Sequence, residues 1–174
     1  MEQLHPMRYG AILALLTLAY GFGLGAVFGA AEDDVKAHLR AEGQQVLTTA
    51  YGDDAGAMQK VAKKAWVYFK RAHLHANGLG AASLALILLL GQLPVGDRGK
   101  RVLALGLGIG SLGYSLFWMW AGLRAPGMGS TGAAKESLQW LAVPSSGLCI
   151  IGLAAVLVMA ARHLLRGSAT RDST

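Results

Sequence analysis

The feature that most constrains this chain is the segregation of its charged residues. Only 15% of its 174 residues are charged, and four long stretches contain no Lys, Arg, Asp or Glu. These stretches are residues 9–31, 72–96, 102–123 and 137–161. A helix needs about 20 apolar residues to cross about 30 Å of hydrocarbon, and each stretch is long enough. We therefore expect four transmembrane helices.

Other ways of crossing a membrane fit the sequence less well. A closed barrel would show short segments of alternating hydrophobicity, and an open sheet leaves backbone groups unpaired in lipid. The first apolar stretch has 23 residues, whereas the apolar core of a signal peptide has about 7–15. We expect it to remain as the first span of an all-α integral membrane protein.

The long polar segment between the first two spans, residues 32–71, is patterned. Apolar residues recur there at intervals of three and four, which predicts one face of a helix that runs into the second span. They are Met58, Val61, Ala62, Ala65, Trp66 and Phe69. A turn signal precedes them at residues 52–56, where Asp53 or Asp54 is placed to cap the helix.

The first two spans are therefore expected to continue beyond the membrane as a helical hairpin that turns near residue 54. The whole chain, residues 1–174, would form a single domain of four transmembrane helices, with this extramembrane hairpin at about residues 32–71.

The distribution of basic residues predicts the orientation. With four spans, both termini and the loop at residues 96–101 lie on one side of the membrane. The short flanks on that side carry Arg8, Arg98, Lys100, Arg101, Arg162, Arg166 and Arg171. By the positive-inside rule both termini are cytoplasmic, in a cell membrane of the bacterial inner-membrane type. The net charge of +6 is explained by topology and anionic lipid, so no nucleic-acid partner is expected.

Glycines are abundant and regularly spaced. Of the 24 glycines, Gly21, Gly25 and Gly29 are four residues apart, as are Gly106 and Gly110. Small residues at this spacing allow close packing of transmembrane helices. We expect these positions to join helices within the chain, within a homo-oligomer or within a larger membrane complex.

His73 and His75 stand at the start of the second span and are the main candidates for a functional site. Residues two apart on a helix are separated by about 200°, so the two rings are expected to serve different faces. Histidine is an axial ligand of haem and a ligand of divalent transition metals. The sequence therefore offers haem b or such a metal as a candidate cofactor.

Carboxylates from the first helix are expected near these histidines. A hairpin turning near residue 54 sets Asp33 level with His75, which brings Glu32, Asp33 and Asp34 toward Lys70 and Arg71. Asn77 follows His73 on the same face of its helix and is a further supporting candidate. Two interpretations stay open: the carboxylates neutralise the cations, or they help to hold a cofactor. His38 lies between Asp34 and Glu42 at spacings of four residues, which suits either a metal site or a solvated face.

Three functions follow as expectations. The first is a small membrane subunit or anchor of an electron-transfer, respiratory-type assembly, which holds haem or a metal near the outer face and offers its hairpin to a soluble partner. The second is a cofactor-free structural or assembly subunit. The third is a small transporter or channel with a path lined by Ser111, Tyr114 and Ser115. The sequence has no P-loop and no nucleophile-base set, so an independent enzyme is not expected.

Overall fold

The structure of the protein, a computed structural model, describes residues 2–169 and contains no strand in that range. Its elements are η1 (Glu2–Met7), α1 (Arg8–Gln45), α2 (Leu47–Tyr51), α3 (Ala55–Gln92), α4 (Asp97–Arg124), α5 (Thr131–Glu136) and α6 (Gln139–Ala169). Helix α1 together with η1, and helices α3, α4 and α6, are long and apolar enough to cross a membrane. The prediction of four such helices is confirmed, and the chain has the organisation of a multi-pass membrane protein.

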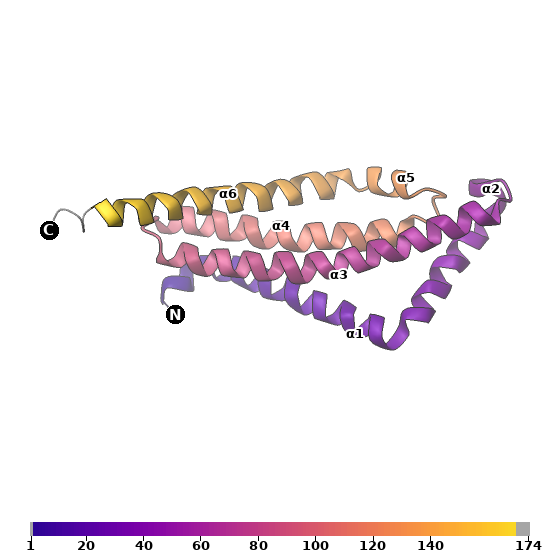
Figure 1. Cartoon of the computed structure of the whole chain (residues 1–174), viewed down its shortest axis with the longest axis horizontal. Coiled ribbons are helices and arrows are strands. Elements are labelled where there is room, and N and C mark those ends of the chain that lie inside the picture. The colour runs from indigo at the N-terminus through magenta and orange to yellow at the C-terminus, as the bar shows by residue number, and fades with distance from the viewer. Residues whose placement is uncertain (1, 170–174) are drawn as a thin grey trace.

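The four long helices run side by side, with α4 in the middle (Figure 1). Helix α4 packs against α1, α3 and α6, and α1 also packs against α3, whereas α6 packs chiefly on α4. Both ends of the described chain lie at one end of the bundle, and α2 lies at the other. We call these the terminal end and the α2 end.

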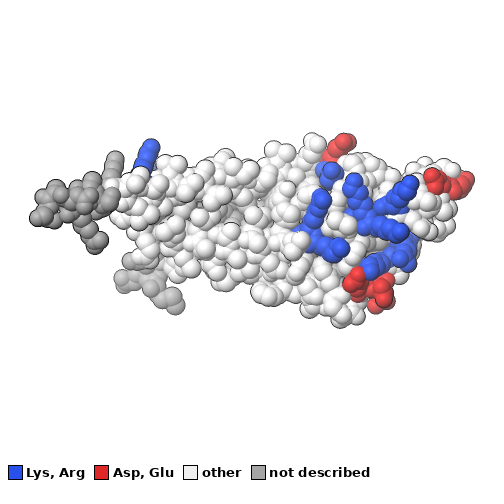
Figure 2. Space-filling view, viewed as in Figure 1, with Lys and Arg blue, Asp and Glu red and all other residues white. Residues whose placement is uncertain are grey.

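Charged side chains gather at the α2 end, and the middle of the visible face is uncharged (Figure 2). This is the distribution that the charge-free stretches of the sequence require. Large apolar side chains face outward in the uncharged zone, including Phe22 at 71% exposed and Ile150 at 66%. Exposed apolar surface on this scale suits contact with lipid.

One buried apolar cluster holds the terminal end together and draws on every long helix. It consists of Met7, Ala14, Ile87, Leu90, Leu93, Ala104, Leu107, Val156 and Ala160. Small residues from α1 and α4 alternate here with larger ones from α3, which lets the helices approach closely.

The chain reverses direction between α1 and α3. Helix α1 ends at Gln45, α2 follows, and Gly52 takes the left-handed conformation with φ 57°. The Asp54 carboxylate then accepts a hydrogen bond of 2.8 Å from the Ala57 backbone N–H. Such a bond satisfies one of the free donors at a helix N-terminus. The predicted turn and cap are confirmed, with Asp54 as the capping residue.

The amphipathic face predicted on the first part of α3 is buried as expected. Met58, Ala62, Ala65, Trp66 and Phe69 are all less than 10% exposed. Several of them form a second apolar cluster with residues of α1 and of the segment after α4. Its buried members are Leu39, Ala65, Trp66, Phe69, Ala125 and Ala134.

Helix α1 has a sharp bend that the sequence analysis does not predict. Ala31 leaves the helical conformation, with φ −141° and ψ 29°. Figure 1 shows α1 moving away from α3 as far as this bend and then returning toward α2. The bend coincides with the end of the first charge-free stretch and lies next to Gly29, where an added Cβ would meet no other atom within 4 Å.

Residues 32–71, which lie between the first two charge-free stretches, are called here the reversal segment. Its tip is attached to the loop after α4, because the Tyr51 hydroxyl donates a hydrogen bond of 2.7 Å to the Pro126 carbonyl. Burial also raises the pKa of the Tyr51 phenol above its ordinary value. Gly129, with φ 66°, lies against Ala50 on the same tip. The tip therefore rests on its neighbour and is not a free projection.

Candidate functional site

The ring of His73 fills a notch between α3 and α1. Its Nδ1–H donates a hydrogen bond of 2.8 Å to the Gly21 carbonyl. A Cβ atom added at Gly25 would lie only 2.9 Å from ring atom Cε1. The Phe28 ring packs edge-on at a centroid distance of 5.7 Å. The glycines of α1 thus provide the space that the imidazole occupies.

Asn77 lies one helical turn after His73 and extends this contact. Its Nδ2 donates to the His73 carbonyl at 3.2 Å and lies 3.5 Å from the imidazole Nε2. Its Oδ1 is buried near Gly21 and accepts no hydrogen bond from the described residues. A buried acceptor without a donor costs about 1–3 kcal/mol. Asn77 and His73 together form the polar part of the seam between α1 and α3.

His75 points to the opposite side of α3, as the predicted angular separation requires. Its Nδ1–H donates a hydrogen bond of 2.8 Å to the Arg71 carbonyl, one turn earlier. The ring packs on α4, with centroid distances of 5.1 Å to Tyr114 and 5.9 Å to Trp118. His75 also lines a shallow groove of about 260 Å³ with Leu74, Gly78 and Leu79.

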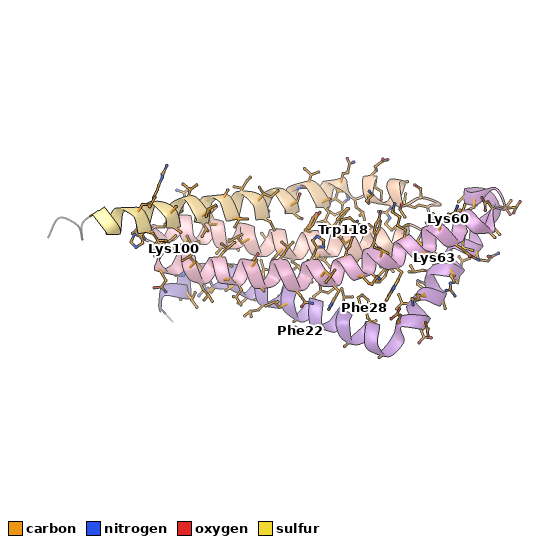
Figure 3. All side chains as sticks on the ribbon, in the orientation of Figure 1. Phe22, Phe28, Lys60, Lys63, Lys100 and Trp118 are labelled. Atoms are coloured by element: carbon orange, nitrogen blue, oxygen red, sulfur yellow. The ribbon has the colours of Figure 1, made fainter. Side chains whose placement is uncertain are left out.

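Arg71 completes an aromatic cluster beside His75. Its guanidinium carbon lies 4.8 Å from the centre of the Trp118 ring and 5.5 Å from that of Tyr68. Placement over two rings stabilises a cation without a carboxylate. The Trp118 indole N–H is buried and donates to none of the described residues. Figure 3 labels Trp118, which belongs to α4.

The acidic residues of α1 do not reach the histidines. Glu32 forms an ion pair with Lys36 on its own helix, and Asp33 lies 4.0 Å from the same ammonium. No carboxylate lies within ion-pair distance of Lys70 or Arg71 among the side chains of residues 4–165. The expected alignment of Asp33 with His75 is wrong. That alignment would set Lys36 level with Ala72, whereas Lys36 lies over the ring of Trp66, six residues earlier on α3. The reason is that α2 lengthens the turn, which shifts the pairing of α1 with α3.

The stripe of Asp34, His38 and Glu42 does not add a site. Asp34 and His38 are exposed on the reversal segment, and Glu42 is partly buried. Within the residues that the structure describes, no three His, Cys, Asp or Glu side chains are placed to hold a metal ion. This part of the chain gives no support for the predicted metal.

The predicted packing glycines behave differently from one another. Gly21 and Gly25 lie against Asn77 and His73, and a Cβ added at Gly110 would come within 2.8 Å of α6. Gly106 makes only an ordinary contact at 3.5 Å, and Gly29 faces open space because α1 bends beside it. Other close contacts, which the spacing does not predict, occur at Gly10, Gly43, Gly80, Gly108, Gly113, Gly122 and Gly152. A regular four-residue spacing would not have found these, because their partners lie on several different helices.

The residues expected to line a transport path are packed. Ser111 and Ser115 are fully buried and donate to backbone carbonyls of α4. The Ser111 hydroxyl also lies 3.4 Å from that of Thr17 on α1. Tyr114 stacks on Phe117 and contacts His75. These side chains join helices in this conformation and do not border open space together.

Of His73 and His75, only His75 has room for a cofactor. An axial ligand needs a free imidazole nitrogen and space beside it for a flat macrocycle. His73 is enclosed by α1, with Asn77 near its second nitrogen. The Nε2 atom of His75 accepts no hydrogen bond from residues 4–165, and the ring borders a groove. Of these two residues, His75 alone therefore meets the geometric requirement.

Comparison with models of known protein families, with curated proteins and with solved structures found no match for this chain.

Proposed function

We propose that this protein is a cofactor-free membrane subunit that stabilises or helps to assemble a larger membrane complex. The environment of His73 is the observation that carries this proposal. The sequence singles out this residue as a ligand, yet its ring joins α3 to the Gly21 carbonyl of α1 and fills the notch at Gly25. Polar residues at the candidate site thus act as helix contacts, which need no bound group.

The proposed partners are the lipid bilayer and other membrane helices, from copies of this chain or from different subunits. Support comes from α6, which packs chiefly on α4 and leaves Ile150, Ile151 and Leu157 more than 60% exposed. The reversal segment would meet a soluble partner. An independent enzymatic activity is not part of this proposal.

The proposed topology has both termini in the cytoplasm and the reversal segment outside a bacterial inner membrane. Arg8, Arg98, Lys100, Arg101 and Arg162 flank the spans at the terminal end, and an excess of short-loop cations marks the cytoplasmic side. We expect a topology reporter inserted at residues 52–54 to show that this site lies outside the cytoplasm. A result that places the site in the cytoplasm would mean that the orientation is the opposite of the one proposed.

A second candidate function is an electron-transfer subunit that holds haem b or a divalent metal. The free Nε2 of His75 and the groove lined by Leu74, Gly78 and Leu79 favour it. In that case haem iron would supply one-electron chemistry near the outer face. Arg71 would contribute positive charge beside it.

Absorption spectroscopy separates the two candidates. We expect the full chain, extracted from native membranes in mild detergent, to be colourless and to contain no stoichiometric iron, copper or zinc by elemental analysis. Light scattering should show a protein mass greater than that of one chain, because a structural subunit retains its partner or a second copy.

The opposite results are equally clear. A Soret band that disappears in His75→Ala and remains in His38→Ala would establish the haem candidate. A colourless protein that is strictly monomeric in several mild detergents would contradict the structural proposal. His38 is a suitable control because it is an exposed histidine of the same chain.

A further inference from the structure

A cationic groove lies between the outer half of α1 and the first part of α3. It has a volume of about 240 Å³ and is lined by Lys36, Arg40, Ala62, Lys63 and Trp66. The groove belongs to the region where basic side chains gather in Figure 2, and Figure 3 labels Lys63 on α3. The bend at Ala31 creates it, because the outer half of α1 returns toward α3 at an angle.

Two of its three cations lack a compensating charge. The Lys36 ammonium pairs with Glu32 and lies 5.4 Å from the centre of the Trp66 ring. Arg40 and Lys63 have no carboxylate within ion-pair distance among the side chains of residues 4–165. They come from different helices and border one concave surface. An anion bound between Arg40 and Lys63 would be attracted by both side chains, and the two helices would not have to move closer together.

The groove also has an apolar floor. Trp66 is 9% exposed, and its ring packs against Phe28 and Phe69. A rigid indole beside a guanidinium and an ammonium is suited to a ligand with an anionic group attached to a less polar body. Phosphate monoesters and diesters have this character, and arginine binds phosphate oxygens through two parallel hydrogen bonds.

The inner edge of the groove reaches the headgroup layer of the proposed bilayer. Trp66 precedes Arg71, at the edge of the second span, by five residues, which is about 8 Å along a helix, and Lys63 precedes it by eight residues, about 12 Å. The polar layer of a leaflet extends about 5–8 Å beyond the hydrocarbon. A lipid phosphate reaches the level of Trp66, and a soluble phosphate reaches the whole groove from the aqueous side.

We propose that the groove formed by Lys36, Arg40, Lys63 and Trp66 binds the phosphate group of an anionic ligand. The phosphate belongs either to the headgroup of an anionic lipid or to a soluble phosphate compound. The lipid source rests on the proposed placement of residues 32–71 outside the hydrocarbon. Binding would hold the outer half of α1 against α3 and so fix the bend at Ala31.

Thermal unfolding of the full chain in lipid nanodiscs tests the proposal. A thiol-reactive dye reports unfolding, because Cys149 is the only cysteine of the sequence and is partly buried. One arm compares phosphatidylcholine discs with discs containing phosphatidylglycerol. The other arm adds inorganic phosphate to phosphatidylcholine discs. We expect the Tm to rise by about 3–5 °C in at least one arm, since a ligand of the native state stabilises it.

Two charge-matched double variants identify the site. The rise should disappear in Arg40→Gln/Lys63→Gln and remain in Lys60→Gln/Lys64→Gln, whose lysines are exposed on α3 outside the groove. A rise with phosphatidylglycerol alone assigns a lipid, and a rise with inorganic phosphate assigns a soluble ligand. The proposed phosphate site would be contradicted if the Tm rose in neither arm. It would also be contradicted if both double variants lost the Tm rise equally. The proposed role as a structural subunit is tested independently, by the light-scattering mass and the absorption spectrum.

Discussion

Gly10→Val is expected to lower the Tm of the detergent-solubilised protein by about 10 °C or to prevent folding. A Cβ atom at Gly10 would overlap the backbone carbonyl of Ala104, and a Cβ at Gly108 would lie 2.7 Å from the Gly10 carbonyl. The backbones of α1 and α4 therefore touch, and no side-chain movement relieves the clash. Overpacking against backbone costs about 3 kcal/mol or more, which corresponds to that shift in a chain of this size.

Gly23→Val is the matched control, because nothing lies within 4 Å of a Cβ added at Gly23 on the same helix. Its Tm should stay within about 3 °C of that of the unmodified protein, since helix propensities of Gly and Val differ by less than about 1 kcal/mol. Both values are measured with the dye that reacts at Cys149. Similar Tm values for Gly10→Val and Gly23→Val would show that α1 and α4 are not in close contact.

A double-mutant cycle at Gly25 and His73 is expected to show strong coupling. His73→Ala removes the ring that fills the notch and should cost about 2–4 kcal/mol of unfolding free energy. Gly25→Ala places a methyl group 2.9 Å from ring atom Cε1 and should cost about 1–2 kcal/mol. In the His73→Ala background the same methyl group enters vacated space, so its cost should fall to about zero or become a gain.

Unfolding free energies for the four proteins come from equilibrium unfolding in mixed detergents, followed by circular dichroism. Additive changes would contradict the packing role of His73. The matched control is His75→Ala with Gly25→Ala, because His75 contacts Tyr114 and Trp118 on the other side of α3. Those two changes should be additive within about 0.5 kcal/mol.

The sequence is sufficient to predict the helices of this protein but not how they pair. The charge-free stretches, the apolar face of α3 and the cap at Asp54 depend on local chemistry, which a reader of the sequence can evaluate directly. The orientation of His73 and His75 to different sides also follows from the helical repeat alone. The structure agrees with each of these predictions.

The alignment of α1 with α3 depends on features that the sequence shows poorly. The break at Val46, the short α2 and the bend at Ala31 have no Pro or Gly at the position where the backbone departs from the helix. They shift the acidic residues of α1 away from the histidines, so the predicted cluster of opposite charges does not form. Small errors at a turn become large errors in which residues meet across a pair of helices.

The same limit applies to glycine. A spacing of four residues identifies Gly21 and Gly25 as a surface that permits close approach, but Gly29 continues the pattern into open space. The tightest contact, at Gly10 and Gly108, has no repeat to reveal it. Whether a glycine is needed depends on the neighbouring helix, which only the three-dimensional arrangement provides.

During synthesis, this chain would bring α1, α3 and α4 together before its last helix exists. Helices α1, α3 and α4 are made in the order in which they pack, and α4 arrives third to contact both of the others. Helix α6 then joins a surface that is already assembled, where Gly110 and Gly113 leave room for Ser145 and Cys149. Each later helix thus finds its partner among those already made, and the last helix completes the cluster at the terminal end with Val156 and Ala160.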